Sequence, residues 1–226
     1  MSHQQKTCQR CGTCCVKGGP ALHKADLPLI TRLALGDLIT LRLGEPVFSP
    51  LIDGIEPTRS ELIKFAGQNN SWACRFFDQA NNLCGAYAHR PLECRLLKCW
   101  EPESITKVIY NDCLSREDIV PEDDELDEKL WDLIEIQQEH CSFTQIASLA
   151  KQFTEKGAPK ILDEIAGIVN MDIRIRQRAI QVRQLSLAEE LLYFGRPLFK
   201  SLAFYGLTVQ EGTQVLTVHP APSLGT

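Results

Sequence analysis

Cysteine is the residue whose spacing in this chain most clearly points to chemistry. Eight of the ten cysteines fall into two short blocks, which are Cys8, Cys11, Cys14 and Cys15, and then Cys74, Cys84, Cys94 and Cys99. A thiolate is a soft ligand that suits zinc, copper(I) and iron–sulfur clusters. Eight clustered thiols are enough to saturate one or two metal centres, so the sequence predicts metal binding through all eight.

The first block reads C-x-x-C-x-x-C-C, and its first three cysteines resemble the start of a bacterial ferredoxin cluster run. We therefore expect an iron–sulfur cluster, of the 4Fe-4S type, with zinc as the alternative. Cys15 follows Cys14 at once, and adjacent side chains tend to project in different directions. The pair is expected either to serve two centres or to supply one ligand and one neighbouring thiol.

The second block spaces its cysteines by nine, nine and four residues. Gaps of this length bridge loops, so this block can supply ligands only after the chain has folded. We expect the two blocks to meet in space. They would then form either two four-sulfur sites, or one site with reactive thiols left over.

A scaffold stapled by disulfides is the competing interpretation of so many cysteines. The polar start at residues 1–6 resembles no secretory signal, and no apolar run approaches the roughly 20 residues of a membrane span. We therefore expect a cytoplasmic location, where thiols are kept reduced. Cys14 and Cys15 also have Cα atoms only about 3.8 Å apart, below the usual disulfide range of about 4.4–6.8 Å.

Several residues near the second block are candidates for supporting roles. Arg90 and Arg95 flank Cys94, where a guanidinium would offset thiolate charge and donate hydrogen bonds around the metal ligands. The alternative for both is an ordinary surface or turn arginine. His89 is either a nitrogen ligand or a bystander, and Cys113 is either a spare thiol near the site or unrelated to it.

The pattern around the second block carries a resemblance to a known family. The matching residues are Cys8, Cys11, Cys14, Cys15, Cys74, Phe76, Cys84, Tyr87, Arg90, Pro91, Cys94, Arg95 and Cys99. Over about residues 6–100 the chain resembles the YkgJ-type cysteine-cluster family, named for its CxxCxxCC motif and its expected chelation of zinc or iron. The resemblance implies metal binding and leaves the reaction open. Flagellin lysine methylases carry a similar cysteine set, which favours an iron–sulfur cluster by analogy.

We expect an α+β fold, mainly helical, in two parts. Residues 1–113 would form a small, irregular, cysteine-rich metal-binding domain with short strands. Residues 114–226 would form a helical region with a short C-terminal hairpin. Pro121 and the acidic run at 117–128 mark the predicted junction, and this run is expected to be the solvated start of a helix.

Local patterns in the front part predict short elements. Apolar spacing over 27–41 predicts one or two short helices, and the Pro- and Gly-rich segment 47–61 is expected to be a loop. Short strands are predicted at 61–66 and 74–77, with a turn over 78–82.

The back part has clearer helical patterns. Helices are predicted over about 126–141, 146–153 and 161–184, and the Ser186-x-x-Glu189 capping box opens another. A weak hairpin is predicted over 207–218, and Cys141 is expected to be a small core residue. Arg174, Arg176, Arg178 and Arg183 are expected to form a charged helix face, with a docking site for an acidic partner as the alternative.

Charge and the lack of catalytic motifs narrow the function. The net charge of −5 argues against generic affinity for nucleic acid. We find no phosphate-binding loop, dinucleotide fingerprint, nucleophile elbow or zinc-protease motif, so no catalytic residue is assigned and a role other than enzyme is favoured.

The leading hypothesis is an iron–sulfur protein for electron transfer or assistance to a redox enzyme. The alternatives are a zinc-stabilised protein-interaction module and a metal-handling protein. We expect a protein partner of unknown identity. We expect no binding to nucleic acid or to a membrane.

Overall fold

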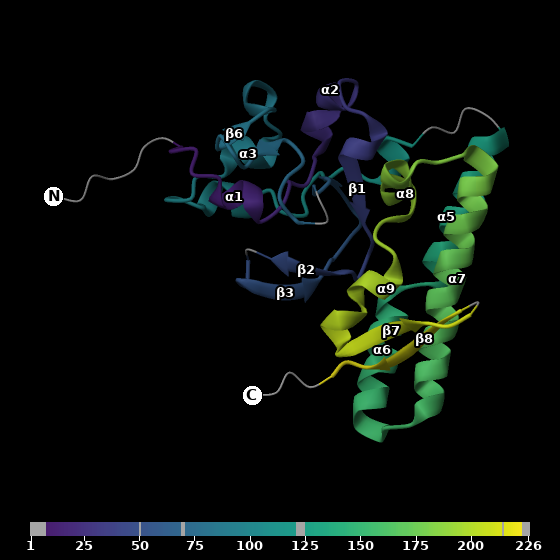
Figure 1. The fold of residues 1–226 in the computed structure, drawn as a ribbon. Helices are drawn as coiled ribbons and strands as arrows, with labels where there is room; N and C mark the ends of the chain where they lie inside the picture. The colour runs from purple at the N-terminus through teal and green to yellow at the C-terminus, as the bar shows by residue number, and fades with distance from the viewer. Residues whose placement is uncertain (1–7, 50, 69–70, 121–124, 214, 223–226) are drawn as a thin grey trace.

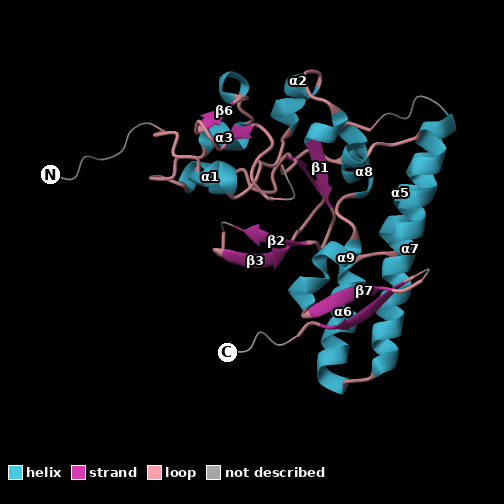
Figure 2. Ribbon diagram, in the orientation of Figure 1, coloured by secondary structure: helices cyan, strands magenta, loops and turns pink. Residues whose placement is uncertain are grey.

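The structure is a computed structural model that describes residues 8–49, 51–68, 71–120, 125–213 and 215–222 (Figure 1). The fold is α+β and mainly helical, as the sequence predicts. Short helices and two-stranded antiparallel sheets make up the front part, and long helices stand side by side at the other end of the molecule (Figure 2). No helix in the described part of the chain is long and apolar enough to cross a membrane.

The front part is built from many short elements. They are α1 (Thr13–Val16), η1 (Lys24–Asp26), α2 (Leu27–Ile30), η2 (Leu35–Asp37), β1 (Leu38–Leu41), β2 (Pro46–Ser49), β3 (Gly54–Pro57), β4 (Leu62–Phe65), β5 (Phe77–Asp78), β6 (Leu83–Cys84), η3 (Tyr87–His89), α3 (Leu92–Leu96), α4 (Glu103–Thr106) and η4 (Arg116–Asp118). Strand β1 pairs with β4, β2 with β3, and β5 with β6.

Two predictions for the front part are wrong in part. The apolar residues Leu38 and Leu41 belong to strand β1, because they pair with Phe65 and Leu62 of β4 rather than continuing a helix. A short apolar run does not distinguish a strand from a buried helix, and here the partner strand decides. The predicted loop 47–61 contains the β2–β3 hairpin, in which Pro46, Pro57 and Gly54 stand at strand ends, where these residue types are tolerated.

The other front-part predictions fare better. Strand β4 lies inside the predicted 61–66 segment. In the predicted 74–77 strand, Cys74 forms only an isolated bridge with Gly67, and the regular strand begins at Phe77. The predicted turn after it is confirmed, because the Asp78 carboxylate accepts a hydrogen bond from the backbone N–H of Ala80 at 2.9 Å.

The back part holds the long helices. Its elements are α5 (Glu125–His140), α6 (Phe143–Lys156), α7 (Pro159–Arg183), α8 (Leu187–Phe194), α9 (Leu198–Ser201), η5 (Leu202–Tyr205), β7 (Leu207–Glu211) and β8 (Leu216–Pro220). The predicted capping box is confirmed, with Ser186 Oγ accepting from the Glu189 N–H and the Glu189 carboxylate accepting from the Ser186 N–H. The β7–β8 hairpin is confirmed as well.

The predicted charged face of the long helix is wrong at Arg176. This side chain is only 4% exposed, and its guanidinium donates to Asp172 at 3.0 Å and to Glu190 at 2.8 Å. Arg174 and Arg178 are exposed, as expected. Because buried guanidinium and carboxylate groups are costly unless paired, this network fixes how α7 and α8 pack.

The predicted acidic helix start is confirmed at Glu125 and Glu128, which are exposed in the first turn of α5, but it is wrong at Asp127. Asp127 is buried in the first turn of α5, and Arg183 Nη2 lies 2.9 Å from its carboxylate. Pro121 and residues 122–124 of the acidic run lie outside the described residues.

One apolar core runs through both parts of the chain. Leu22 and Ile63 of the front part belong to the same buried cluster as Ile165 and Leu192 of the helices. Cys141 is fully buried in this cluster, which confirms its predicted core role. Whether residues 1–113 fold as a separate domain stays a prediction.

Polar contacts also join the two parts. Arg116, buried at the start of η4, donates to the Glu61 carboxylate at 3.0 Å and to the backbone carbonyl of Tyr193 at 2.7 Å. Thr40 Oγ1 of β1 donates to the backbone carbonyl of Leu192 at 2.5 Å. Helix α8 is therefore bonded to the sheet β1–β4, and in Figure 1 α3 and β6 lie on the opposite side of β1 from α8.

Candidate metal centre

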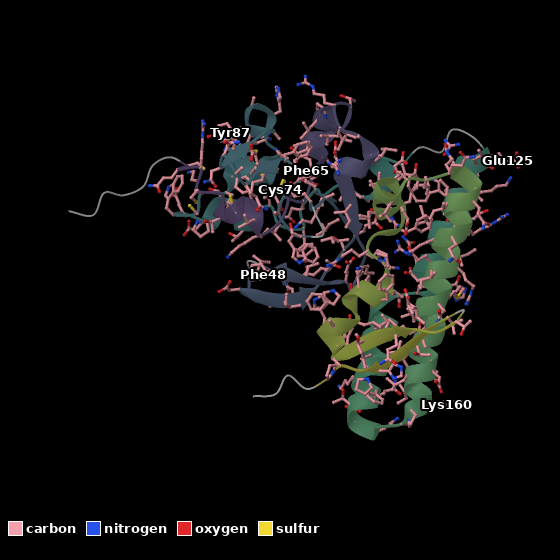
Figure 3. The ribbon with its side chains drawn as sticks, viewed as in Figure 1. Phe48, Phe65, Cys74, Tyr87, Glu125 and Lys160 are labelled. Carbon is pink, nitrogen blue, oxygen red and sulfur yellow. The ribbon has the colours of Figure 1, made fainter. Side chains whose placement is uncertain are left out.

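The two cysteine blocks come together at the end of the front part remote from the long helices. Figure 3 shows sulfur atoms gathered around α1, α3 and β6, close to the labelled Cys74. The backbone N–H of Cys74 donates to the carbonyl of Cys15 at 2.8 Å, which bonds one block directly to the other. The prediction that the blocks meet in space is confirmed.

A glycine makes this close approach possible. Gly12 precedes α1 with φ at 77°, a backbone conformation that side chains rarely adopt. A Cβ atom built on Gly12 would lie 2.3 Å from the ring of Phe77, which pairs with Cys84 across β5–β6. The first cysteine block therefore packs against the hairpin that carries part of the second.

Five thiols are near enough to affect one another electrostatically. They are Cys14, Cys15, Cys74, Cys84 and Cys94, which come from α1, from the bridge after β4, from β6 and from α3. Burial raises the pKa of the Cys94 thiol, and the negative charges of Cys74, Cys14 and Cys84 raise it further. Burial likewise raises the pKa of Cys74. Metal binding must therefore displace protons from these thiols, so metal affinity should fall as the pH falls.

Cys14 and Cys15 converge, which corrects the expectation that they project in different directions. Their sulfur atoms lie 3.8 Å apart, at one side of α1. A hydrogen bond joins the two sulfurs, and with Cys15 as the donor it lowers the pKa of Cys14 to about 6, with smaller contributions from backbone N–H groups and from the positive charge of Arg90. The same hydrogen bond raises the pKa of Cys15, because it holds the Cys15 proton.

We predict that Cys14 is the reactive thiol of this pair in metal-free protein. A thiol with a pKa of about 6 is mostly thiolate at neutral pH, and the thiolate is the nucleophile. Replacing Cys15 by alanine removes the donor, so alkylation of Cys14 by iodoacetamide at pH 7 should slow by about tenfold or more. Cys15→Ser keeps a donor and is the matched control. Peptide mapping of the alkylated site gives the rate, and equal rates in all three proteins would contradict the assignment.

Two cations lie beside the thiols, and one of them was not found from the sequence. Arg90 was singled out, and its charge does reach Cys14. Lys64 of β4 was missed, because one lysine in a strand is typical of a solvent-facing position. Burial lowers the pKa of Lys64, whose nearest charges include Glu93 and the thiols of Cys74 and Cys94. Both cations favour the thiolate form that a metal requires.

Arg95 and His89 are placed differently from Arg90. Arg95 Nη1 donates to the backbone carbonyl of Arg90 at 2.6 Å, and Arg95 Nη2 lies 3.9 Å from the Asp26 carboxylate. His89 is exposed at the end of η3. A role for either residue around the metal ligands stays a prediction.

The remaining motif cysteines lie at the edge of the group. Cys11 Sγ lies 3.3 Å from Thr13 Oγ1, and this hydrogen bond lowers the pKa of Cys11. Cys8 accepts a hydrogen bond from the backbone N–H of Arg10 at 3.4 Å. Cys8, Cys11 and Cys99 are all exposed. Their inclusion among the ligands stays a prediction.

A polar group centred on His23 lies behind the second block and was also missed. His23 is buried, with Nδ1 2.8 Å from the carbonyl of Asn111 and 3.9 Å from Cys113 Sγ. Its Nε2 lies 3.6 Å from the carboxylate of Glu93. The neighbouring Cys113 sulfur and Glu93 carboxylate raise the pKa of His23 to about 10. Protonated His23 thus attracts Glu93, the residue next to Cys94. No local spacing around His23 in the sequence indicates this interaction.

The donor chemistry of the five gathered thiols fits a thiophilic metal or cluster. A single tetrahedral zinc has zinc–sulfur distances of about 2.3 Å, which places its sulfur ligands about 3.8 Å from one another. Cys14 and Cys15 meet that separation. Across residues 8–49, 51–68, 71–120, 125–213 and 215–222, no three His, Cys, Asp or Glu side chains are gathered tightly enough to hold one ion.

Comparison with known proteins gives one match. Residues 7–114 match the family model CxxCxxCC, described as "Putative zinc- or iron-chelating domain". No curated protein and no solved structure matches the chain. The matched segment contains both cysteine blocks and supports metal binding, but the description leaves zinc and iron undistinguished. It ends before the helices α5 to α8.

Proposed function

From residues 7–114, which carry the CxxCxxCC domain, we propose that this protein holds an iron–sulfur centre that serves electron transfer or assists a redox enzyme. The ligands would come from the eight motif cysteines, with Cys14, Cys15, Cys74, Cys84 and Cys94 nearest to one another. Such a centre would supply one-electron redox chemistry. The partner would be a protein that exchanges electrons with it.

The spacing of the thiols is the observation that carries this proposal. A single ion draws its ligands into a tight set of three or four, and the described residues contain no such set. Thiols from both blocks are nevertheless near enough for their charges to interact. A centre with several metal atoms suits donors spread in this way. Arg90 and Lys64 would offset part of its negative charge.

A structural zinc site is the second candidate. It is favoured by the 3.8 Å separation of the Cys14 and Cys15 sulfurs, which suits two ligands of one tetrahedral ion. In this case the metal would hold α1 against the second block, and the helical part would bind a partner protein. Strong chelation would then unfold the front part.

Metal and sulfide analysis of protein purified without oxygen separates the two candidates. We expect about four or eight irons per chain, matching acid-labile sulfide and a broad absorption band near about 400 nm. One or two zinc ions per chain, without sulfide or visible absorption, would overturn the iron–sulfur proposal in favour of the zinc site.

A further inference from the structure

A cavity of about 340 Å³ opens between α2 and the segment from η3 to α3, at the edge of the front part. Its lining includes Asp26, Pro28, Leu29, Arg32, Arg90 and Arg95. In Figure 1, α2 stands beside the region of α3 and β6. None of the motif cysteines lines the cavity, although Arg90 lines it and also lies near Cys14. Its volume is at the lower end of the range for small-molecule sites.

The lining carries more positive than negative charge. Three arginines, Arg32, Arg90 and Arg95, face a single carboxylate, that of Asp26. That carboxylate is already engaged, because it accepts hydrogen bonds from the backbone N–H groups of His23 at 3.1 Å and Leu92 at 2.9 Å. It also lies 3.9 Å from Arg95. Asp26 therefore balances Arg95 at most.

The other two arginines keep uncompensated donors at the cavity. Within the part of the chain that the structure describes, no carboxylate lies within ion-pairing distance of Arg32 or Arg90. The Nε atom of Arg90 is buried without a hydrogen-bond acceptor. The Arg90 guanidinium is nevertheless held in place, with its carbon 4.0 Å from the centre of the Tyr87 ring. A buried donor of this kind is costly until an acceptor reaches it.

We propose that this cavity binds a small molecule through an oxyanion, either a carboxylate or a phosphate, held by Arg32 and Arg90. A guanidinium presents parallel N–H donors that match two oxygens of such a group. Pro28 and Leu29 line the same cavity and would contact an apolar part of the ligand. Stacking on Tyr87 fixes Arg90 before the ligand arrives, so little side-chain freedom is lost on binding.

Isothermal titration calorimetry of the full chain, purified with its metal, tests this site. Inorganic phosphate and succinate are the two probes, titrated at constant ionic strength against a chloride background. At least one probe should bind with a Kd of about 1 mM or below. Saturation by phosphate alone or by succinate alone assigns the oxyanion, and both results support the site.

Substitution of an exposed arginine locates the binding. Arg32→Gln should weaken binding of the preferred probe by about tenfold or more, since it removes a charged hydrogen-bond donor pair. Arg32→Lys keeps the charge but loses the paired donors, so its Kd should lie between those of the unchanged protein and of Arg32→Gln. Arg174→Gln removes an equivalent exposed charge on α7 and should leave the Kd unchanged. Absence of binding by both probes up to about 10 mM, or equal weakening by Arg32→Gln and Arg174→Gln, would overturn the proposal.

Discussion

Replacing Cys94 by serine is expected to abolish most metal loading, with the affinity falling by more than the roughly 100-fold that loss of an outer-shell partner can cost. Cys94 lies on α3, where burial and the charges of Cys74, Cys14 and Cys84 all raise its pKa. A bound metal would offset that crowding far more than a neighbouring cation does, so Cys94 is expected to be a ligand that the centre cannot easily replace. A serine hydroxyl is a hard donor that stays protonated and does not substitute for a soft thiolate.

Metal per chain, measured after purification without oxygen, is the readout for this variant. Cys113→Ser is the matched control, because Cys113 is partly buried nearby but lies outside both blocks. The control should keep the metal content of the unchanged protein. If Cys94→Ser retained full metal content, or if both variants lost metal equally, the assignment of Cys94 as a ligand would be wrong.

Signals carried by neighbouring residues were sufficient to predict much of the helical part. The capping box at Ser186 and Glu189 is satisfied within four residues of the chain, so its pattern needs no tertiary context. Strand β1 is the opposite case. The spacing of Leu38 and Leu41 fits a helix as well as a strand. Strand β4, more than twenty residues later in the chain, provides the pairing partner that decides for a strand.

The candidate site shows the same division between local and distant information. Cysteine types and spacings indicated which residues could bind metal and that the two blocks would meet. The surroundings of those residues depend on contacts across the fold. His23 meets Glu93 and Cys113, which lie about seventy and ninety residues further along the chain. Lys64 of strand β4 affects Cys94 of helix α3 through its charge, so no pattern within one segment could reveal either interaction.

Replacing Asp172 by asparagine is expected to destabilise the whole protein by about 3–5 kcal/mol, the cost of removing one partner from a buried ion pair. Asp172 is fully buried on α7. Its carboxylate accepts from Arg176 Nε at 3.0 Å, from Gln137 Nε2 at 2.6 Å and from the backbone N–H of Leu198 at 3.0 Å. Arg42 Nη1 lies 3.8 Å away. The substitution leaves two buried guanidinium groups with one carboxylate fewer.

The effect should reach the front part as well as the helices. Arg42 is buried just after β1, and burial lowers its pKa, while the charge of Asp172 is the largest influence that raises it again. Asp172→Asn removes that compensation from the junction between the sheet β1–β4 and the helices. Unfolding of the two parts, followed by circular dichroism and by metal release in urea, should therefore shift to lower urea together.

The pH dependence of unfolding gives a second readout of Asp172. Burial alone would raise its pKa, but Arg176 and Arg42 together bring the pKa below its ordinary value. A carboxyl whose pKa is lowered on folding contributes stability above its unfolded pKa of about 3.9, and that stability is lost as the pH falls through the folded value. The free energy of unfolding of Asp172→Asn should therefore fall less steeply with decreasing pH than that of the unchanged protein. Both proteins are measured without metal, so that protonation of metal-binding thiols does not contribute.

Asp163 supplies the matched control, since it is an exposed carboxylate on the same helix. Asp163→Asn should change the free energy of unfolding by no more than about 0.5 kcal/mol, as surface substitutions usually do. If Asp172→Asn were no more destabilising than Asp163→Asn, the buried network would not hold the two parts together. The front part would then owe its position against the helices to the shared apolar core alone.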